Sequence, residues 1–569
     1  MSEKNKITIV LENEKLNNSV DDLRENSVIL THDSSMTIMS TLLKNNLISG
    51  SFCGGRGDCG RCKIQFLKGA TAPTALERSM MEPEELRQGY RLACMAKPKD
   101  DCTIRLALVV APKIAILSKM IDVTENIDQL GQQNEKTKNQ KADVMEPNVG
   151  TETPVNMLHS NIDNVTDVTN NKETDVMVAV DLGTTTIAMQ LVELDTGRIV
   201  DTHCEMNPQR RYGADVLSRI LASCEGNRET LQRLVVEVLE RGVERFRNQN
   251  ATIRCMCIAG NTTMEHLLMG YDVSSLGSSP FTPVEIGLQE YRHPTWDFTV
   301  WLTPGISAFV GGDIVAGLYA CGMLAGHMPD QLAGQEECVN QSKHDGQEET
   351  SLLIDLGTNG EMAVTDGTRM IVTATAAGPA FEGGASAGIV GSDMIACAAQ
   401  LLRQGVLDET GLLAEPFFTE GVSVQAADKT RYYFVEGGET QAFYMFQQDI
   451  RSLQMAKAAV RAGVEVLLGR LEEKWAARVY LAGGFGYYLD VEAAFRIGLL
   501  PEQFRGNVQA VGNTSLKGAY MIGRDLWQRK IDKQTLEQSL SSIESINLAK
   551  QEEFEKLYIK YMDFAPDAQ

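Results

Sequence analysis

The chain has 569 residues, and its 23% charged and 43% apolar content is that of an ordinary soluble globular protein. The length exceeds what one hydrophobic core supports, so roughly three or four domains are expected. The formal net charge of −23 argues against nucleic acid or an anionic membrane as a partner. Apolar runs stay short of the roughly 20 residues of a membrane span, and the N-terminus lacks the apolar core of a signal peptide, so we expect a cytoplasmic protein.

Residues 1–110 have the pattern of a small α+β unit. Strands are predicted at Ile7–Leu11, Lys63–Leu67 and Cys102–Leu108, where apolar and polar residues alternate. Between the first two strands, apolar residues recur at helical spacing over residues 36–43, behind a short polar segment that can cap a helix. The order of strand, helix, loop and strand predicts one compact sheet with a helix on it.

A glycine-rich loop within this unit carries three cysteines. Cys53, Cys59 and Cys62 form a C-x5-C-x2-C run, and Cys94 follows after the next strand. Three thiolates on one loop and a fourth from elsewhere are what an iron–sulfur cluster needs, and glycines let the backbone approach it closely. The spacing resembles that of adrenodoxin-like and activator-type [2Fe–2S] ferredoxins. A structural zinc site is the alternative, but it usually combines two C-x2-C pairs and only one is present.

Residues 111–174 change in composition. Asn, Gln, Thr, Asp and Glu dominate, and aromatic or periodic apolar residues are almost missing. Such a stretch cannot bury enough apolar surface to offset its ordering entropy, so it is predicted to be a low-complexity flexible linker. A tether of this length would let the first unit move relative to the rest of the chain.

An internal duplication opens the next region. A strand, the turn Asp-Leu-Gly-Thr and a return strand occur at residues 175–197 and again at 351–367. The repeat predicts a two-lobed domain with two facing turns. Asp181 and Asp355 would end their strands beside tight turns whose N–H and hydroxyl groups can hold phosphate, and they would bind Mg²⁺ or orient water. A pair of ordinary hairpin turns is the alternative.

Two further glycine-rich turns accompany the repeat. A buried strand opens into Gly483, Gly484 and Gly486, where the backbone could lie flat against an adenosine. Asp313 follows two glycines, which would present its carboxylate on a turn at the cleft. A glycine-rich strand–helix turn without a ligand is the alternative for the first of these.

The three turns resemble the phosphate and adenosine loops of the actin, Hsp70 and sugar-kinase superfamily. Their fusion to a [2Fe–2S] ferredoxin resembles the reductive activators of corrinoid proteins, as do the stretches at 207–220, 258–270, 304–317, 376–384 and 449–463. The resemblance implies a β-grasp ferredoxin at 1–110, a two-lobed actin-like ATPase at 175–530 and a helical tail at 531–569. The nucleotide-binding residues that it implies are Gly183, Thr184, Thr185, Thr186, Gly357, Thr358, Asn359, Gly378, Gly483, Gly484 and Gly486, with Asp181, Asp313 and Asp355 in catalytic roles.

The same resemblance implies a function. The chain would use ATP with Mg²⁺ and a [2Fe–2S] cluster to return a corrinoid protein or corrinoid methyltransferase from Co(II) to Co(I), with an upstream electron donor; a homodimer is compatible with this. Family members place a folded connecting and middle domain after the ferredoxin, where this sequence has only its linker. A small-molecule kinase with a redox-sensing module and a non-catalytic redox sensor are the alternatives.

The remaining cysteines and one histidine are interpreted as structural. Cys102 falls inside a predicted strand, and Cys255 and Cys257 share one face of another, which favours core thiols. His266 lies on a predicted helix near the nucleotide region, where packing is at least as good an interpretation as ligand contact. The amphipathic tail is expected to pack on the ATPase.

Overall fold

The computed structural model describes residues 4–11, 27–44, 62–81, 83–106, 174–249, 251–324, 349–357, 359–376, 381, 391–415, 419–422, 429–435, 443–483 and 489–564. Several of the predicted features lie outside these residues. They are the linker up to residue 173, and Cys53, Cys59, Thr358, Gly378, Gly484 and Gly486.

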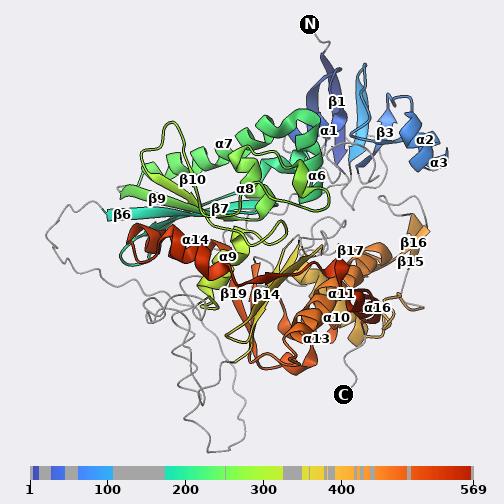
Figure 1. Cartoon of the computed structure of the whole chain (residues 1–569). Helices are drawn as coiled ribbons and strands as arrows, with labels where there is room; N and C mark the ends of the chain where they lie inside the picture. Colours follow the sequence, from blue (N-terminus) through green and yellow to red (C-terminus); the bar gives the residue numbers. More distant parts are fainter. Residues whose placement is uncertain are drawn as a thin grey trace, which may run out of the picture.

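The N-terminal unit is a five-stranded sheet with helix α1 packed on it (Figure 1). The strand order is β2-β1-β5-β3-β4, in which β1 and β5 run parallel and the other pairs antiparallel. The elements are β1 Lys4–Leu11, β2 Ser27–Asp33, α1 Ile38–Lys44, β3 Lys63–Lys68, α2 Ala75–Met80, α3 Pro83–Arg87, β4 Tyr90–Leu92 and β5 Cys102–Leu106. Ile7, Ile9 and Ile104 of the sheet pack with Ile38 and Leu42 of α1. The β-grasp arrangement is confirmed, although strand β2 was not predicted.

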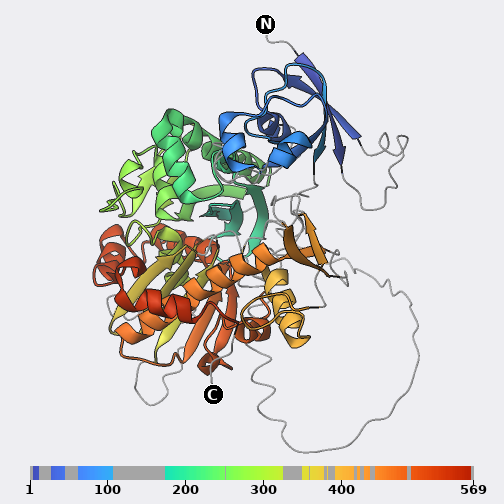
Figure 2. The same ribbon diagram turned by 90° about the vertical axis from the view of Figure 1, so that its right-hand side faces the viewer.

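The first lobe behind it is built on a six-stranded sheet. The order is β10-β11-β9-β6-β7-β8; β6, β7 and β8 form an antiparallel meander, and β9 lies parallel to β6. Its strands are β6 Thr174–Leu182, β7 Thr186–Glu193, β8 Ile199–Met206, β9 Ala251–Gly260, β10 Gln289–Tyr291 and β11 Thr299–Leu302. Its helical segments are η1 Pro208–Arg211, α6 Val216–Ala222, η2 Ser223–Asn227, α7 Arg228–Arg247, α8 Thr262–Met269 and η3 Ser274–Leu276. Figures 1 and 2 show the N-terminal unit beside this lobe.

The second lobe repeats five of the six strands of this sheet in the same order, and its sixth strand lies at the opposite edge. The order β19-β18-β12-β13-β14-β20 has an antiparallel meander of β12, β13 and β14 with β18 parallel to β12, as in the first lobe. Its strands are β12 Ser351–Leu356, β13 Gly360–Thr365, β14 Met370–Thr375, β18 Arg478–Ala482, β19 Val508–Gly512 and β20 Glu544–Ser545. Its helices include α10 Gly391–Arg403, α11 Gln447–Arg470, α13 Val491–Arg496 and η6 Glu502–Phe504, beside a small sheet of β15 Thr419–Val422, β16 Lys429–Val435 and β17 Phe443–Phe446. The duplication seen in the Asp-Leu-Gly-Thr turns therefore extends over both sheets.

Each lobe also sends one helix to the other. Helix α9 (Gly312–Ala320) follows the first lobe's β11, yet Ile314 and Leu318 pack on Leu353 in the second lobe's sheet. Helix α14 (Thr514–Trp527) follows the second lobe's β19, yet Gly523 lies so close to the first lobe's sheet that a Cβ atom there would be 2.5 Å from Cε of Met177. Both helices lie between the two sheets in Figure 1. The lobes are thus joined by two crossed helices and not only by loops.

Helices α9 and α14 touch through their backbones. A Cβ atom added at Gly518 would lie 1.9 Å from the carbonyl oxygen of Ala316, a distance that no side chain tolerates. Gly317 faces Thr514 in the same crossing, with 3.0 Å between a Cβ built there and the threonine Oγ1. Small residues are therefore required where the lobes meet.

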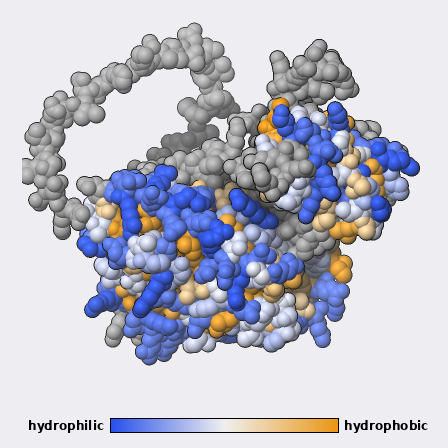
Figure 3. All heavy atoms as spheres, turned by 90° about the horizontal axis from the view of Figure 1, so that it is seen from above, coloured by the Kyte–Doolittle hydropathy of each residue, from blue (hydrophilic) through white to orange (hydrophobic). Residues whose placement is uncertain are grey.

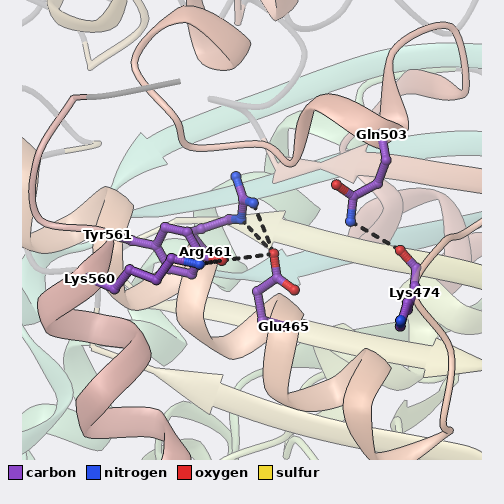
Figure 4. Close-up of polar contacts among 6 residues, drawn as sticks. All are labelled: Arg461, Glu465, Lys474, Gln503, Lys560 and Tyr561. Carbon is purple, nitrogen blue, oxygen red and sulfur yellow. Dashed lines mark hydrogen bonds and ion pairs between the residues drawn. The ribbon is translucent and has the colours of Figure 1, made fainter. Parts of the chain in front are cut away.

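The C-terminal tail packs along the second lobe, as its amphipathic pattern predicts. It comprises α15 Lys533–Leu540, β20, η7 Leu548–Lys550 and α16 Glu552–Lys560. Phe554 and Leu557 of α16 lie against the core of the second lobe. In Figure 4, Arg461 of α11 donates to Glu465 at 2.9 and 3.0 Å, and the Tyr561 hydroxyl donates to the same carboxylate at 3.2 Å.

The face of the molecule drawn in Figure 3 is largely hydrophilic, with apolar side chains in small scattered groups. Among the described helices, none combines the length and the apolar character needed to cross a bilayer.

Candidate nucleotide and iron–sulfur sites

The first turn begins at Asp181, near the end of β6. Two side chains of the α14 segment bind this carboxylate: Asn513 Nδ2 donates to Oδ2 at 2.7 Å and Ser515 Oγ donates to Oδ1 at 3.1 Å. Burial raises the pKa of Asp181, and these two hydrogen bonds act in the opposite direction. Asn513 is also the N-cap of α14, so the helix that crosses between the lobes starts at the phosphate turn.

The second turn begins at Asp355, near the end of β12. Gly357 N–H donates to the carbonyl of Asn359 at 2.9 Å and closes the turn, while Asn359 Nδ2 donates to Glu361 Oε1 at 3.1 Å. Burial raises the pKa of Asp355 to about 8, and the charges of Asp313 and Asp181 act in the same direction. Carboxylates from segments that are far apart in sequence thus raise one another's pKa.

The third glycine-rich turn reaches the same place. Gly483 follows β18 with a positive φ of 89°, and a Cβ atom there would lie 2.6 Å from Oδ1 of Asp355. Only glycine allows this close approach. The structure therefore brings the start of the predicted adenosine loop beside the second phosphate turn.

Asp313 stands in the first turn of α9, where the two preceding glycines bring the helix start against the start of α8. A Cβ atom on Gly311 would lie 2.5 Å from Cα of Asn261. Burial raises the pKa of Asp313 to about 7, the charge of Asp181 raises it too, and the N–H of Ile314 lowers it. The three predicted aspartates are therefore close enough to influence one another.

Two buried glutamates join them that the sequence analysis missed. Glu361 on β13 has its pKa raised well above the ordinary value by burial, then by Asp313 and Asp355. Glu265 on α8 has its pKa raised by burial and by Asp313, and it accepts hydrogen bonds from Gly260 N–H at 3.1 Å and from Thr303. The sequence did carry a signal for both. Glu361 is a charged residue in the strand that directly follows the second turn, and Glu265 is a charged residue in the first turn of a helix that is otherwise mostly buried.

Of the predicted nucleotide-binding residues, the described ones line these turns. They are Gly183, Thr184, Thr185, Thr186, Gly357, Asn359 and Gly483. The described residues hold no ready-made group of three or more metal-ligating side chains. Mg²⁺ usually takes one or two carboxylates and completes its shell with water and substrate phosphates, so mutually repelling carboxylates beside two phosphate turns fit MgATP.

The two described cysteines of the iron–sulfur loop lie side by side. The Sγ atoms of Cys62 and Cys94 are 3.2 Å apart, and Ala93 N–H donates to the carbonyl of Cys62 at 2.8 Å, which ties the end of β4 to the start of β3. Two thiolates held this close can ligate one metal atom, so the pair fits half of a four-cysteine cluster site.

The residues interpreted as structural are packed. Cys102, Cys255 and Cys257 are buried among apolar side chains, and burial raises the pKa of Cys102 to about 11 and that of Cys255 to about 12. His266 is buried; its Nδ1 lies 2.7 Å from the carbonyl of Thr262, and its Nε2 accepts from Val284 N–H at 3.0 Å. Both ring nitrogens are used inside the lobe, so His266 is a packed helix residue.

Sequence profiles of known families match three parts of the chain. The RACo middle region matches residues 176–325, and the C-terminal domain of RACo, the ASKHA domain, matches 349–387 and 384–568. A 2Fe-2S iron-sulfur cluster binding domain matches 22–99. The middle region therefore is present as the first lobe, and the interpretation that the linker stands in its place is wrong.

Individual relatives agree with these matches. The corrinoid activation enzyme RamQ of Eubacterium limosum is 28% identical over 422 residues, which cover 63% of this chain and 66% of RamQ. The [Co(II) methylated amine-specific corrinoid protein] reductase of Methanosarcina barkeri is 23% identical over 390 residues, 60% of this chain and 68% of that protein. The alignments thus span about two thirds of each relative's length.

A solved structure shares the fold over nearly the whole chain. The reductive activator for corrinoid, iron-sulfur protein superposes with a TM-score of 0.57 at 22% identity, covering 98% of both chains. The 2Fe-2S domain, the middle region and the ASKHA domain follow one another here in that order. The middle-region and C-terminal profiles together match more than half of the residues, and the chain belongs to the RACo family.

Proposed function

We propose that this chain is an ATP-dependent electron-transfer protein that returns an inactive Co(II) corrinoid protein, or a corrinoid methyltransferase, to Co(I). One observation carries the proposal: a ferredoxin-type cysteine pair and an acidic two-turn nucleotide site lie on the same polypeptide. The two curated relatives are named for corrinoid activation and for reduction of a Co(II) corrinoid protein, which supports this substrate class.

The ferredoxin unit supplies the electron. Cys53, Cys59, Cys62 and Cys94 would hold a [2Fe–2S] cluster, and when bound it would supply one electron at about −400 mV. The protein's part is to fix two of the thiols 3.2 Å apart at the end of the sheet. Because each turnover uses one electron, an upstream donor must reduce the cluster again, and we place the whole cycle in the cytoplasm.

The ATPase lobes would make an unfavourable transfer possible. If the cobalt is harder to reduce than the cluster, each 59 mV of difference costs about tenfold in equilibrium. Asp181, Asp313 and Asp355 would bind MgATP between lobes that are joined by crossed helices. A nucleotide can shift the lobes only by its differential affinity for open and closed states, so closure on ATP must favour the docked, transfer-competent state.

The test is reduction of a corrinoid protein under anaerobic conditions. Full-length chain with reconstituted iron would be mixed with a Co(II) corrinoid protein and a chemical reductant, and Co(I) followed by its visible spectrum. We expect Co(I) to form with MgATP and to fail to form without it. Equal Co(I) formation in both samples would contradict the proposal, and so would an iron-free, colourless protein after reconstitution.

Two variants separate the roles. Cys94→Ser is expected to abolish transfer while nucleotide binding stays intact, because the residue lies in the ferredoxin unit. Asp181→Asn is expected to abolish ATP-dependent transfer while the cluster spectrum stays intact. A result in which each variant loses both properties would argue for misfolding and against this division of labour.

A further inference from the structure

The carbonyl groups of the first phosphate turn are held from inside the lobe. Asn207 Nδ2 donates to the carbonyl of Gly183 at 2.9 Å, and Asn207 N–H donates to that of Thr185 at 2.8 Å. A guanidinium N–H of Arg219 donates to the carbonyl between them, that of Thr184. Asn207 and Arg219 are both buried. Consecutive peptide groups of the turn therefore have their oxygens directed into the protein interior.

The direction of a carbonyl decides the direction of the next N–H group. In a trans peptide the C=O group and the following N–H group lie in one plane and point in opposite directions within it. Pinning the carbonyls of Gly183 and Thr184 inward therefore turns the N–H groups of Thr184 and Thr185 outward. Successive N–H groups that point to one side form a concave anion site, of the kind that holds phosphate oxygens.

Arg219 is itself rigidly placed. Its Nε donates to the carbonyl of Gly213 at 3.2 Å, and Nη1 donates to Gln209 Oε1 at 3.3 Å. A Cβ atom on Gly213 would lie 2.2 Å from Cβ of Ser218, so only glycine lets that carbonyl come so close to α6. A buried charge is costly unless its donors are satisfied, and here the guanidinium fixes α6, the preceding loop and the turn together.

We propose that Arg219 and Asn207 are positioning residues for the nucleotide: they set the peptide planes of the first turn so that its N–H groups hold a phosphate of ATP. The proposal rests on the proposed ATP-dependent function, and neither residue touches the nucleotide itself. Residues 207–219 would then act by holding the backbone of the phosphate turn in place, and they would not form a second ligand-binding surface.

The experiment compares a ligand with phosphates to one without. Equilibrium binding of ATP and of adenosine would be measured on the full-length chain with Arg219→Lys and with Asn207→Asp. Lysine keeps the charge but not the fork of donors. Aspartate keeps the size and the oxygen that caps Gln209 N–H, but it replaces the donor to Gly183 with an acceptor. We expect ATP affinity to fall roughly tenfold or more in each variant and adenosine affinity to stay within about twofold.

Arg461→Lys serves as a matched control. Arg461 is also buried, but it lies on α11 of the second lobe, where it pairs with Glu465 and contacts the Tyr561 ring. This variant is expected to keep its affinity for both ATP and adenosine.

Unchanged ATP binding in Arg219→Lys and Asn207→Asp would overturn the proposal. An equal loss of affinity for ATP and for adenosine would overturn it too, because that result indicates a structural role alone. If Arg219→Lys fails to fold, the isosteric Asn207→Asp decides between these outcomes. Because no corrinoid protein is present, the result is independent of whether electron transfer itself occurs as proposed.

Discussion

The two Asp-Leu-Gly-Thr turns share a sequence and a position at the end of a strand, yet their aspartates have different surroundings. Asp181 accepts hydrogen bonds from Asn513 and Ser515 of the crossing helix segment. Among the described residues no side chain donates to Asp355, and burial raises its pKa to about 8. A repeated motif therefore reproduces the backbone of the turn without reproducing the hydrogen-bond donors around its carboxylate.

Because of this difference, we expect the two lobes to contribute differently to MgATP binding. Burial raises the pKa of both aspartates, but only at Asp181 do two side-chain donors oppose that rise. Asp355 would be largely protonated at neutral pH until a cation offsets its repulsion with Asp313. We expect the first lobe to provide a ready site and the second to gain charge as MgATP binds.

The largest expected effect is a loss of ATP hydrolysis on substitution of either aspartate, and the accompanying change in MgATP affinity distinguishes the two. Asp181→Asn and Asp355→Asn should each lower ATP hydrolysis at least about a hundredfold, since each removes a carboxylate that, on the proposed function, would face the metal and the phosphates. The affinity for MgATP should fall more in Asp181→Asn, because Asp355 is largely neutral in the ligand-free site. Titration of a fluorescent ATP analogue measures this, and equal losses of affinity would remove the proposed asymmetry.

The pH dependence of stability follows from the same raised pKa values. With a folded pKa of about 8 for Asp355, against an unfolded value near 4, the folded state binds more protons over that range. Stability of the nucleotide-free chain should therefore fall as pH rises from about 4 to about 8, and flatten above it. Between pH 6 and pH 9 we expect a loss on the order of 2 kcal/mol from this group.

Urea denaturation at the two pH values measures this loss. In Asp355→Asn the free energy of unfolding should depend clearly less on pH, because asparagine does not titrate. Asp201, whose pKa is lowered by its ion pair with Arg245, provides a control position: Asp201→Asn should leave the slope between pH 6 and pH 9 as it is. A wild-type chain whose stability rose over this interval would show that Asp355 is ionised before ligands bind.

Motifs contained within one segment could be predicted from the sequence, whereas contacts between segments far apart in the chain could not. The duplicated strands, both turns and Asp313 could be found because each motif carries its own glycines and its own apolar strand. The donors to Asp181 could not, since Asn513 lies 332 residues away and its role depends on α14 crossing to the other lobe. Strand β2 was missed because an edge strand with little alternation gives a weak signal. Glu361 was overlooked although it directly follows the second turn.

A smaller effect isolates one donor of the first turn. Ser515→Ala removes a single hydrogen bond of 3.1 Å from a buried serine and leaves the N-cap residue Asn513 in place. The pKa of Asp181 should rise, and MgATP affinity should fall by about three- to tenfold at neutral pH. The loss should grow as the pH falls, because protonation of Asp181 then competes with the metal. Ser539→Ala, at a buried serine that donates only within α15, is the matched control and should leave affinity unchanged.

The smallest effect concerns a feature of the second lobe, the packing of α16 on α11. Tyr561→Phe removes the 3.2 Å hydrogen bond to Glu465 and keeps the ring that lies 4.4 Å from the Arg461 guanidinium carbon. Because Glu465 retains its ion pair with Arg461, no buried charge is left alone, and the free energy of unfolding should fall by less than about 1 kcal/mol. ATP affinity should not change, since this contact joins α11 to the tail and includes no residue of either turn. Urea denaturation and nucleotide titration on one preparation check both statements. A loss of affinity without a loss of stability would show that the tail reaches the second turn after all, and the contrast between the two aspartates would then depend on the tail as well as on α14.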